Sequence, residues 1–160
     1  MRKLLYVGAL FLLMLITGVF WGTWFTLTRS IESFSPDEFI HIGKVIIVNV
    51  AMPMRVIMPS GILFMLLSLW IYKRKKTASF YIGILSVILI IATLLITLLV
   101  LVPIDNDLKV WTATTIPVDF EAIRHKWRTY HAIRTFLSLA SFLSFSLFVL
   151  NDLAVGFKKP

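Results

Sequence analysis

A cation, an indole and an imidazole recur at helical spacing between positions 124 and 134. If Arg124 is placed at 0° on a helix of about 100° per residue, Trp127 falls near −60°, His131 near −20° and Arg134 near −80°. These four side chains share a stripe about 80° wide, whereas Arg128 lies about 40° to the other side. Such a stripe attracts anions and aromatic rings, so it predicts one wall of a ligand pocket.

The same residue types have a second interpretation. Arginine and tryptophan also anchor helices at the level of lipid headgroups. That interpretation suits Arg124 and Arg128, which lie farther from the apolar part of the helix. His131 and Arg134 lie deeper and on one face, and there a functional role is favoured.

A metal site is not predicted. His125 lies about 120° from His131 on the same helix, so the two imidazoles do not readily share one ion. The sequence has no cysteine and no HExxH motif. A histidine-bound metal would need His41 and His131 to meet across helices with help from a carboxylate. The segment Asp105-Asn106-Asp107 could suggest a calcium loop, but it is better explained as a turn.

The stripe belongs to the longest polar segment of the chain, residues 103–135. This segment holds two of the three histidines and two of the five tryptophans. The chain as a whole is nevertheless unusually apolar, with 59% hydrophobic and 15% charged residues. A typical soluble domain has about 45–50% apolar residues and about 25% charged residues. Lipid is therefore expected to solvate much of the molecule, and the net charge of +8 is attributed to membrane topology rather than to nucleic-acid binding.

Four apolar stretches are each long enough to cross a bilayer, at about 1.5 Å per residue. We predict one all-α domain over residues 1–160, a polytopic membrane four-helix bundle with a helix and loop cap on the outer side. The spans are expected at about 4–27, 54–72, 78–102 and 132–150, and the cap at 30–52 and 103–131. Pro103 is expected to end the third span.

The first cap segment has a strong helix start at Ser35-Pro36-Asp37-Glu38, with the pattern of a capping box. The helix that follows carries His41, and Asn49 on the same helix is included among the candidate substrate-binding residues. Pro53 is expected to kink or break this helix before the second span.

The last helix is expected to open at Pro117-Val118-Asp119 and to run to about Leu150. Only residues 135–150 are free of charge, which is short of the hydrocarbon thickness. Arg134 should therefore lie at or just inside the outer edge of the membrane, and a charge there should snorkel outward or face a polar interior.

An even number of spans places both termini and the basic turn at 73–76 on one side. Basic residues number eight on each side, but those beside the termini and the turn cluster at span ends, where the positive-inside rule acts. We therefore expect a multi-pass plasma-membrane protein with cytoplasmic N- and C-termini.

The polar segment resembles the anthrone oxygenase-like family of small four-span membrane proteins. The matching residues, read as P-x-x-N-x4-W-x5-P-x-D-x4-R-x2-W-x3-H-x2-R, are Pro103, Asn106, Trp111, Pro117, Asp119, Arg124, Trp127, His131 and Arg134. The resemblance covers nearly the whole chain loosely and is specific over about 103–135.

The resemblance implies oxygenation of a lipophilic, anthrone-like aromatic compound without a cofactor. On that hypothesis a base, His131 or His41, removes a benzylic proton, and Arg134 stabilises the enolate with support from Asn106. Trp111 and Trp127 would stack on the substrate, and Arg124 is a further candidate contact. The expected partners are the lipid bilayer and a lipophilic small molecule. The alternative is a non-catalytic membrane protein that binds a lipophilic ligand or a partner through residues 103–135.

Overall fold

The computed structural model describes residues 1–112 and 114–157. Within these residues the chain is entirely helical, which confirms the predicted fold class, and four continuous helical stretches are long and apolar enough to cross a membrane. The elements in order are α1 (Arg2–Thr26), the 3-10 helix η1 (Thr28–Ser33), α2 (Pro36–Ile71), α3 (Ala78–Ile96), the π-helical turn η2 (Thr97–Leu101), α4 (Val102–Val110) and α5 (Phe120–Phe157).

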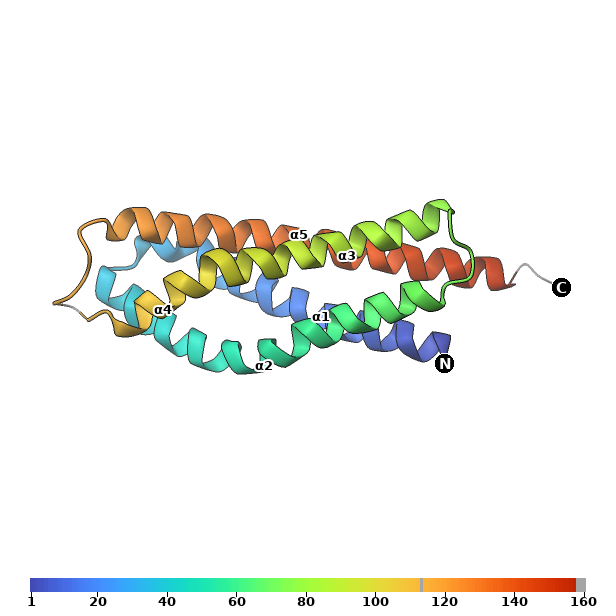
Figure 1. Cartoon of the computed structure of the whole chain (residues 1–160). Helices are drawn as coiled ribbons and strands as arrows, with labels where there is room; N and C mark the ends of the chain where they lie inside the picture. Colours follow the sequence, from blue (N-terminus) through green and yellow to red (C-terminus); the bar gives the residue numbers. More distant parts are fainter. Residues whose placement is uncertain (113, 158–160) are drawn as a thin grey trace.

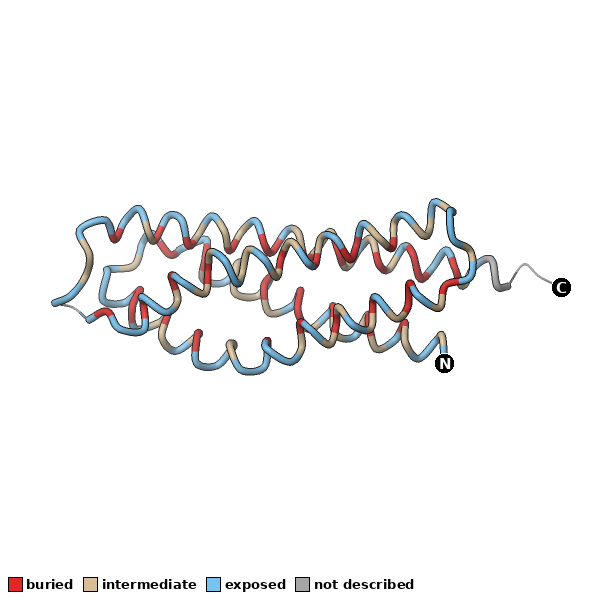
Figure 2. Tube along the Cα trace, viewed as in Figure 1, coloured by how far each residue is buried: buried red, intermediate tan, exposed pale blue. Residues whose placement is uncertain are grey.

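The long helices run side by side in an elongated bundle (Figure 1). Helix α1 contacts α2 and α5, and α3 contacts the same two helices. Both termini and the 72–77 connection lie at one end, which we call the termini end. The 111–119 connection and η1 lie at the other, which we call the loop end. Buried residues recur along the inward faces of the helices (Figure 2).

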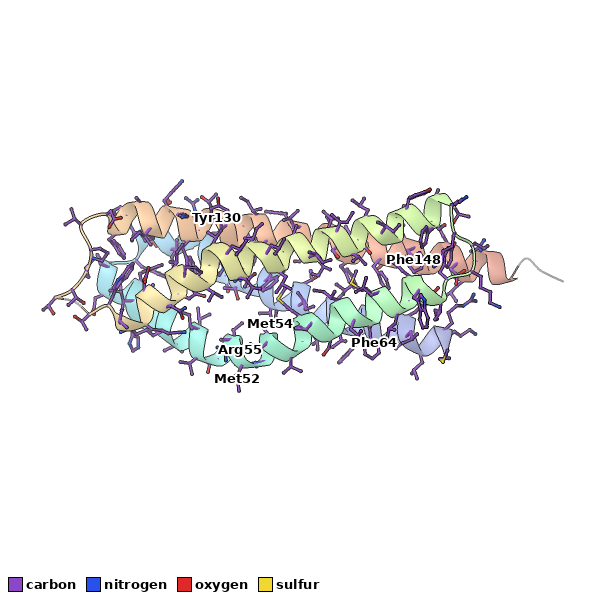
Figure 3. All side chains as sticks on the ribbon, viewed as in Figure 1. Met52, Met54, Arg55, Phe64, Tyr130 and Phe148 are labelled. Atoms are coloured by element: carbon purple, nitrogen blue, oxygen red, sulfur yellow. The ribbon has the colours of Figure 1, made fainter. Side chains whose placement is uncertain are left out.

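Two apolar clusters fill the bundle. One extends from the termini end along α1, α2, α3 and α5 and includes Leu13, Met65 and Phe145, all fully buried. The other lies at the loop end and joins α2, α4 and α5 around Phe39, Leu108 and Trp127. Outward-facing side chains such as Met52 are apolar as well, whereas the neighbouring Met54 points inward (Figure 3). An apolar outer face of this kind is stable in lipid rather than in water.

Helix α2 joins what the sequence divides into a cap helix and a span. Its 36 residues include Pro53 and Pro59, and the helix bends along its course without breaking (Figure 1). A proline removes one backbone donor and crowds the preceding turn, and bending relieves that crowding. The predicted capping box is confirmed, because Ser35 Oγ accepts from the Glu38 N–H and the Glu38 carboxylate accepts from the Ser35 N–H at 2.8 Å.

Pro103 does not end the third span, which corrects the prediction. The helical path continues from Ala78 to Val110 through η2 and α4. The π-helical turn widens the helix just before the proline, where a regular turn would clash with the proline ring. Asp105, Asn106 and Asp107 are consequently helical residues of α4 and not the turn that we expected.

The last helix begins within three residues of the predicted start. After a turn at Val118 and Asp119, α5 runs for 38 residues to Phe157, beyond the Leu150 expected from charge alone. Buried hydroxyl groups join α5 to its neighbours: Ser141 donates to the Ser86 carbonyl of α3 at 2.7 Å, and Thr17 of α1 donates to the Ser138 carbonyl at 3.3 Å. Lys158 and Lys159, two of the eight basic residues counted on the side of the termini, lie outside the described residues.

Candidate functional site

Three side chains of α5 form a continuous stack that faces the interior of the bundle. The ring centroids of Trp127 and His131 are 3.7 Å apart, and Arg134 Nη2 donates to His131 Nδ1 at 3.0 Å. Residues at i, i+4 and i+7 lie on one face of a helix, so the sequence stripe and the stack are the same feature. All three residues are at most 8% exposed.

Asp105 of α4 extends this stack across the bundle. Trp127 Nε1 donates to Asp105 Oδ1 at 3.1 Å. The carboxylate thus holds the indole by its only polar atom, and the indole in turn packs on the imidazole. Because η2 and Pro103 precede α4, the local helical register decides that Asp105, and not its neighbour, points at Trp127.

Arg134 is a buried cation held by residues from different elements. Its Cζ lies 4.4 Å from the centroid of the Phe20 ring of α1, which is a cation–π distance. Its Nη1 donates to Thr97 Oγ1 of η2 at 3.4 Å. Its Nε, also buried, has no hydrogen-bond partner. A guanidinium this deep retains donor capacity that the described residues leave unused.

The hydrogen bond between Arg134 and His131 defines the state of the imidazole. Arginine has only donors, and Arg134 Nη2 lies 3.0 Å from Nδ1 and 3.4 Å from Nε2 of His131. The guanidinium can therefore donate to whichever ring nitrogen carries the lone pair. In either tautomer the other nitrogen keeps its N–H as a donor, and the lone pair faces Arg134.

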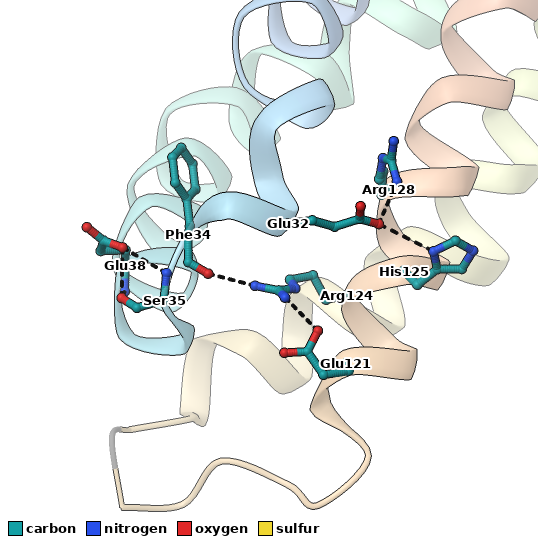
Figure 4. Close-up of polar contacts among 8 residues, drawn as sticks. All are labelled: Glu32, Phe34, Ser35, Glu38, Glu121, Arg124, His125 and Arg128. Atoms are coloured by element: carbon teal, nitrogen blue, oxygen red, sulfur yellow. Dashed lines mark hydrogen bonds and ion pairs between the residues drawn. The ribbon is translucent and has the colours of Figure 1, made fainter.

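Arg124 lies at the loop end and is held by groups of the protein itself. Its Nη1 donates to the Phe34 carbonyl at 2.7 Å and its Nη2 to Glu121 Oε2 at 2.5 Å (Figure 4). One helical turn away, Arg128 pairs with Glu32 at 2.5 Å. These contacts join the segment before α2 to α5 and close the loop end.

Trp111 is buried in the apolar cluster of the loop end rather than in the stack. Its ring packs edge-on against the Phe120 ring, with the ring centroids 6.2 Å apart. Its backbone carbonyl accepts a hydrogen bond from Lys44 Nζ at 2.6 Å. It shares this cluster with Trp127. The loop-end aromatic residues thus support the stack from one side.

The structure does not bring the remaining predicted site residues to the stack. His41 and Asn49 are exposed on α2. Asn106 is exposed on α4, where its Oδ1 accepts from Lys109 Nζ at 2.9 Å. The sequence analysis chose Asn106 because the family motif contains it. It missed Asp105 because a turn at residues 105–107 does not predict which side chain points toward the bundle interior.

Among the residues that the structure describes, no three histidine, cysteine, aspartate or glutamate side chains lie close enough together to hold a metal ion. The side chains that meet at the site are a carboxylate, an indole, an imidazole and a guanidinium. Such a set can position an aromatic ring, donate hydrogen bonds to an oxyanion and exchange a proton.

A hollow of about 340 Å³ lies on α1 and α5 near this site. It is lined by Met14, Thr17, Gly18, Trp21, Leu139 and Phe142. Trp21 follows Phe20, the residue whose ring contacts Arg134, and Thr17 lies one helical turn before Phe20. The lining of the hollow includes no residue of the stack. A Cβ atom built on Gly18 would meet no atom within 4 Å, so the missing side chain leaves this hollow open.

The sequence matches a known protein family. The sequence model described as anthrone oxygenase matches residues 48–144. The matched region contains Asp105, Trp127, His131 and Arg134, whereas His41 lies before it. No match is found among curated proteins or solved structures. Because the match covers more than half of the 160 residues, the chain belongs to the anthrone oxygenase family.

Proposed function

We propose that this protein oxygenates a lipophilic, anthrone-like aromatic compound with O2 and without a cofactor. The observation that carries the proposal is the buried pair of His131 and Arg134, stacked on Trp127 inside the region that matches the family. This pair can stabilise a substrate oxyanion and handle one proton in an apolar setting, where such interactions are strong.

The proposed reaction balances with substrate and O2 alone. Loss of one proton from the benzylic CH2 carbon gives an enolate, which transfers an electron to O2. Superoxide and the carbon radical then combine to form a peroxide. Protonation of the peroxide and loss of the second benzylic hydrogen with cleavage of the O–O bond give the ketone and water. One oxygen atom enters the product, the other leaves as water, and the substrate supplies the electrons.

In this proposal Arg134 switches its hydrogen bond from His131 to the substrate oxygen. An enolate oxygen accepts a charge-assisted hydrogen bond better than a neutral imidazole does. The transfer would free the imidazole lone pair of His131 for the benzylic proton, so binding and activation of the base occur together. Trp127 would stack on the aromatic substrate.

Asp105 acts on the reaction through Trp127 and is a positioning residue. Its hydrogen bond fixes the plane of the indole and therefore the surface on which a substrate ring would stack. His41, Asn49 and Asn106 have no role in the proposal because they are exposed away from the stack.

The test uses membranes that contain the protein, with emodin anthrone under air. We expect anthraquinone formation above that of empty membranes, with one atom of ¹⁸O from ¹⁸O2 in the product. His131→Ala should lower the rate by about 10²–10⁴-fold, and Arg134→Ala by about 10²–10³-fold. The matched controls are His125→Ala and Arg128→Ala, which lie on the same helix outside the stack.

The controls separate loss of chemistry from loss of protein. His125→Ala and Arg128→Ala should keep the wild-type rate at equal expression. A wild-type rate equal to that of empty membranes would remove the oxygenase proposal for this substrate. Equal losses in the controls and the stack variants would show that folding, and not the stack, sets the rate.

A second function, binding of a lipophilic ligand without turnover, is favoured by one observation. In the structure the lone pair of His131 is already engaged, so the site presents donors rather than a base. Quenching of tryptophan fluorescence by an anthraquinone, lost in Trp127→Leu and without oxygen uptake from the corresponding anthrone, would identify this function instead.

We place the protein in the plasma membrane with both termini in the cytoplasm. Support comes from the basic residues at the termini end, Arg2, Lys3 and the 73–76 turn, which are close to helix ends. We expect a reporter that is active only in the cytoplasm to be active when it is fused after Lys76. Activity of an extracytoplasmic reporter at that position would reverse the orientation.

A further inference from the structure

A second hollow lies at the termini end, far along the bundle from the stack. It has a volume of about 400 Å³ and is lined by Arg2, Lys3, Tyr6, Val7, Leu10, Val149 and Leu153. Four of these residues are aliphatic and come from α1 and α5, so the floor is an apolar groove between two helices. The basic residues lie at the start of α1, at the mouth of the groove.

The mouth of the groove has an excess of positive charge. Asp152 is 3% exposed and accepts from Tyr6 Oη at 3.0 Å. The same carboxylate pairs with Arg74 at 3.0 Å and with Arg2 at 3.3 Å. One buried carboxylate therefore faces two guanidinium groups, those of Arg2 and Arg74. Lys3, which lines the groove together with Arg2, adds a third cation.

We propose that this groove binds an anionic phospholipid. One acyl chain would lie along Val7, Leu10, Val149 and Leu153, and the phosphate would accept hydrogen bonds from Lys3 and from the part of Arg2 that is not engaged by Asp152. The ligand thus matches an apolar floor and a cationic mouth in one molecule. The groove belongs to helices long enough to cross a bilayer, where such lipids are already concentrated.

The apolar floor distinguishes a phospholipid from a free anion. Inorganic phosphate would use only the mouth, and surface cations bind it weakly in water. A lysine that merely anchors the helix at headgroup level needs no groove beside it. The combination predicts a preference for an anionic headgroup together with a requirement for an acyl chain.

The experiment measures lipid occupancy by native mass spectrometry of the purified full chain in non-ionic detergent. Dioleoylphosphatidylglycerol is compared with dioleoylphosphatidylcholine, which has the same chains and no net charge. We expect the anionic lipid to bind more tightly, and Lys3→Ala to weaken it by about fivefold. Its control, Lys73→Ala, removes an exposed cation at the same end that does not line the groove.

A second pair of variants tests the groove itself. Val7→Trp places an indole in the groove from a residue that is 63% exposed, so the fold should tolerate it, and bound lipid should be lost. Leu4→Trp is the control, since Leu4 is 74% exposed on the same helix and does not line the groove. Inorganic phosphate should not displace the lipid.

Three results would overturn the proposal. The first is equal binding of the two lipids by the wild-type chain. The second is a loss in Lys73→Ala as large as that in Lys3→Ala, which would indicate diffuse attraction. The third is unchanged occupancy in Val7→Trp with an unchanged thermal midpoint, which would place the lipid elsewhere on the bundle.

Discussion

At the scale of single residues, the hydrogen bond from Trp127 to Asp105 connects the two helices of the polar segment. The two residues lie on α5 and α4, and their contact is 3.1 Å long. Removing a partner and leaving a buried donor unsatisfied costs about 1–3 kcal/mol. Asp105 could act by accepting this hydrogen bond or by its negative charge. A substitution that keeps the acceptor and removes the charge distinguishes the two roles.

We expect Asp105→Leu to lower both the thermal midpoint and the oxygenation rate, because Trp127 loses its acceptor. Asp105→Asn keeps a carbonyl oxygen for Trp127 and should retain most of both. Asp107→Leu, at an exposed position of the same helix, is the control and should change neither. Loss of activity in Asp105→Asn at an unchanged midpoint would show that the negative charge itself is needed.

The hollow on α1 and α5 gives a prediction for Gly18, if substrate reaches the stack by that route. A Cβ atom at Gly18 meets no atom within 4 Å, so a leucine there would extend into the hollow. We expect Gly18→Leu to raise the KM for emodin anthrone severalfold at a similar thermal midpoint. Gly22→Leu is the control, because its Cβ also meets nothing within 4 Å and Gly22 does not line the hollow. An unchanged KM in Gly18→Leu would exclude this route.

At the scale of helices, η2 aligns α4 with α5. The turn precedes Pro103, whose ring disfavours a regular helix by about 3 kcal/mol relative to alanine. We expect Pro103→Ala to keep or raise the thermal midpoint while it lowers the oxygenation rate, because a regular helix would rotate Asp105 away from Trp127. A faster variant would show that η2 does not serve the site.

Close packing between helices depends on small residues at particular positions. A Cβ atom at Gly83 of α3 would lie 2.6 Å from Leu69 Cδ2 and 3.0 Å from the Phe148 ring. Overpacking of this kind costs about 1–3 kcal/mol, so Gly83→Ala should lower the thermal midpoint. Gly18→Ala gains the same helix propensity without a clash and should not lower it. Equal midpoints would indicate that Leu69 and Phe148 repack freely.

The helices were predictable from the sequence to the extent that apolar length and capping define them. The capping box at Ser35 and the spans needed only local rules. The path through Pro103 was not predictable, because a π-helical turn has no local sequence signature strong enough to oppose the proline rule. The error at Asp105 follows from it, since a shift in helical register changes which side chain faces inward.

The residue spacing on α5 predicted that Trp127, His131 and Arg134 share one face of the helix. In the structure this face points into the bundle. On α2 the resemblance offered His41 as a possible base, and that residue is exposed. Angular spacing tells which residues share a face but not which neighbour that face meets. Arg124 illustrates the same limit: it is on the stripe and buried, yet it binds Phe34 and Glu121.

At the scale of the whole molecule, Asp152 closes the termini end as Arg124 closes the loop end. Its carboxylate joins Tyr6 of α1, Arg74 of the 72–77 connection and α5 itself. We expect Asp152→Leu to lower the thermal midpoint in detergent, because about 1–3 kcal/mol is lost when Tyr6 loses its buried acceptor. Asn151→Leu, at an exposed neighbouring position, should leave the midpoint unchanged. A similar loss in both variants would mean that the helix end, rather than the carboxylate, is sensitive.

The contact between Arg134 and His131 has a consequence for a chain whose long helices are apolar enough to lie in lipid. In the unliganded structure the imidazole lone pair faces the guanidinium, so a hydrocarbon with a weakly acidic C–H bond would meet no exposed base. In the proposed reaction, only a compound with an oxygen able to draw the guanidinium away would uncover it. Discrimination among membrane solutes would then precede any encounter with oxygen, and it would depend on one arginine changing the atom to which it donates.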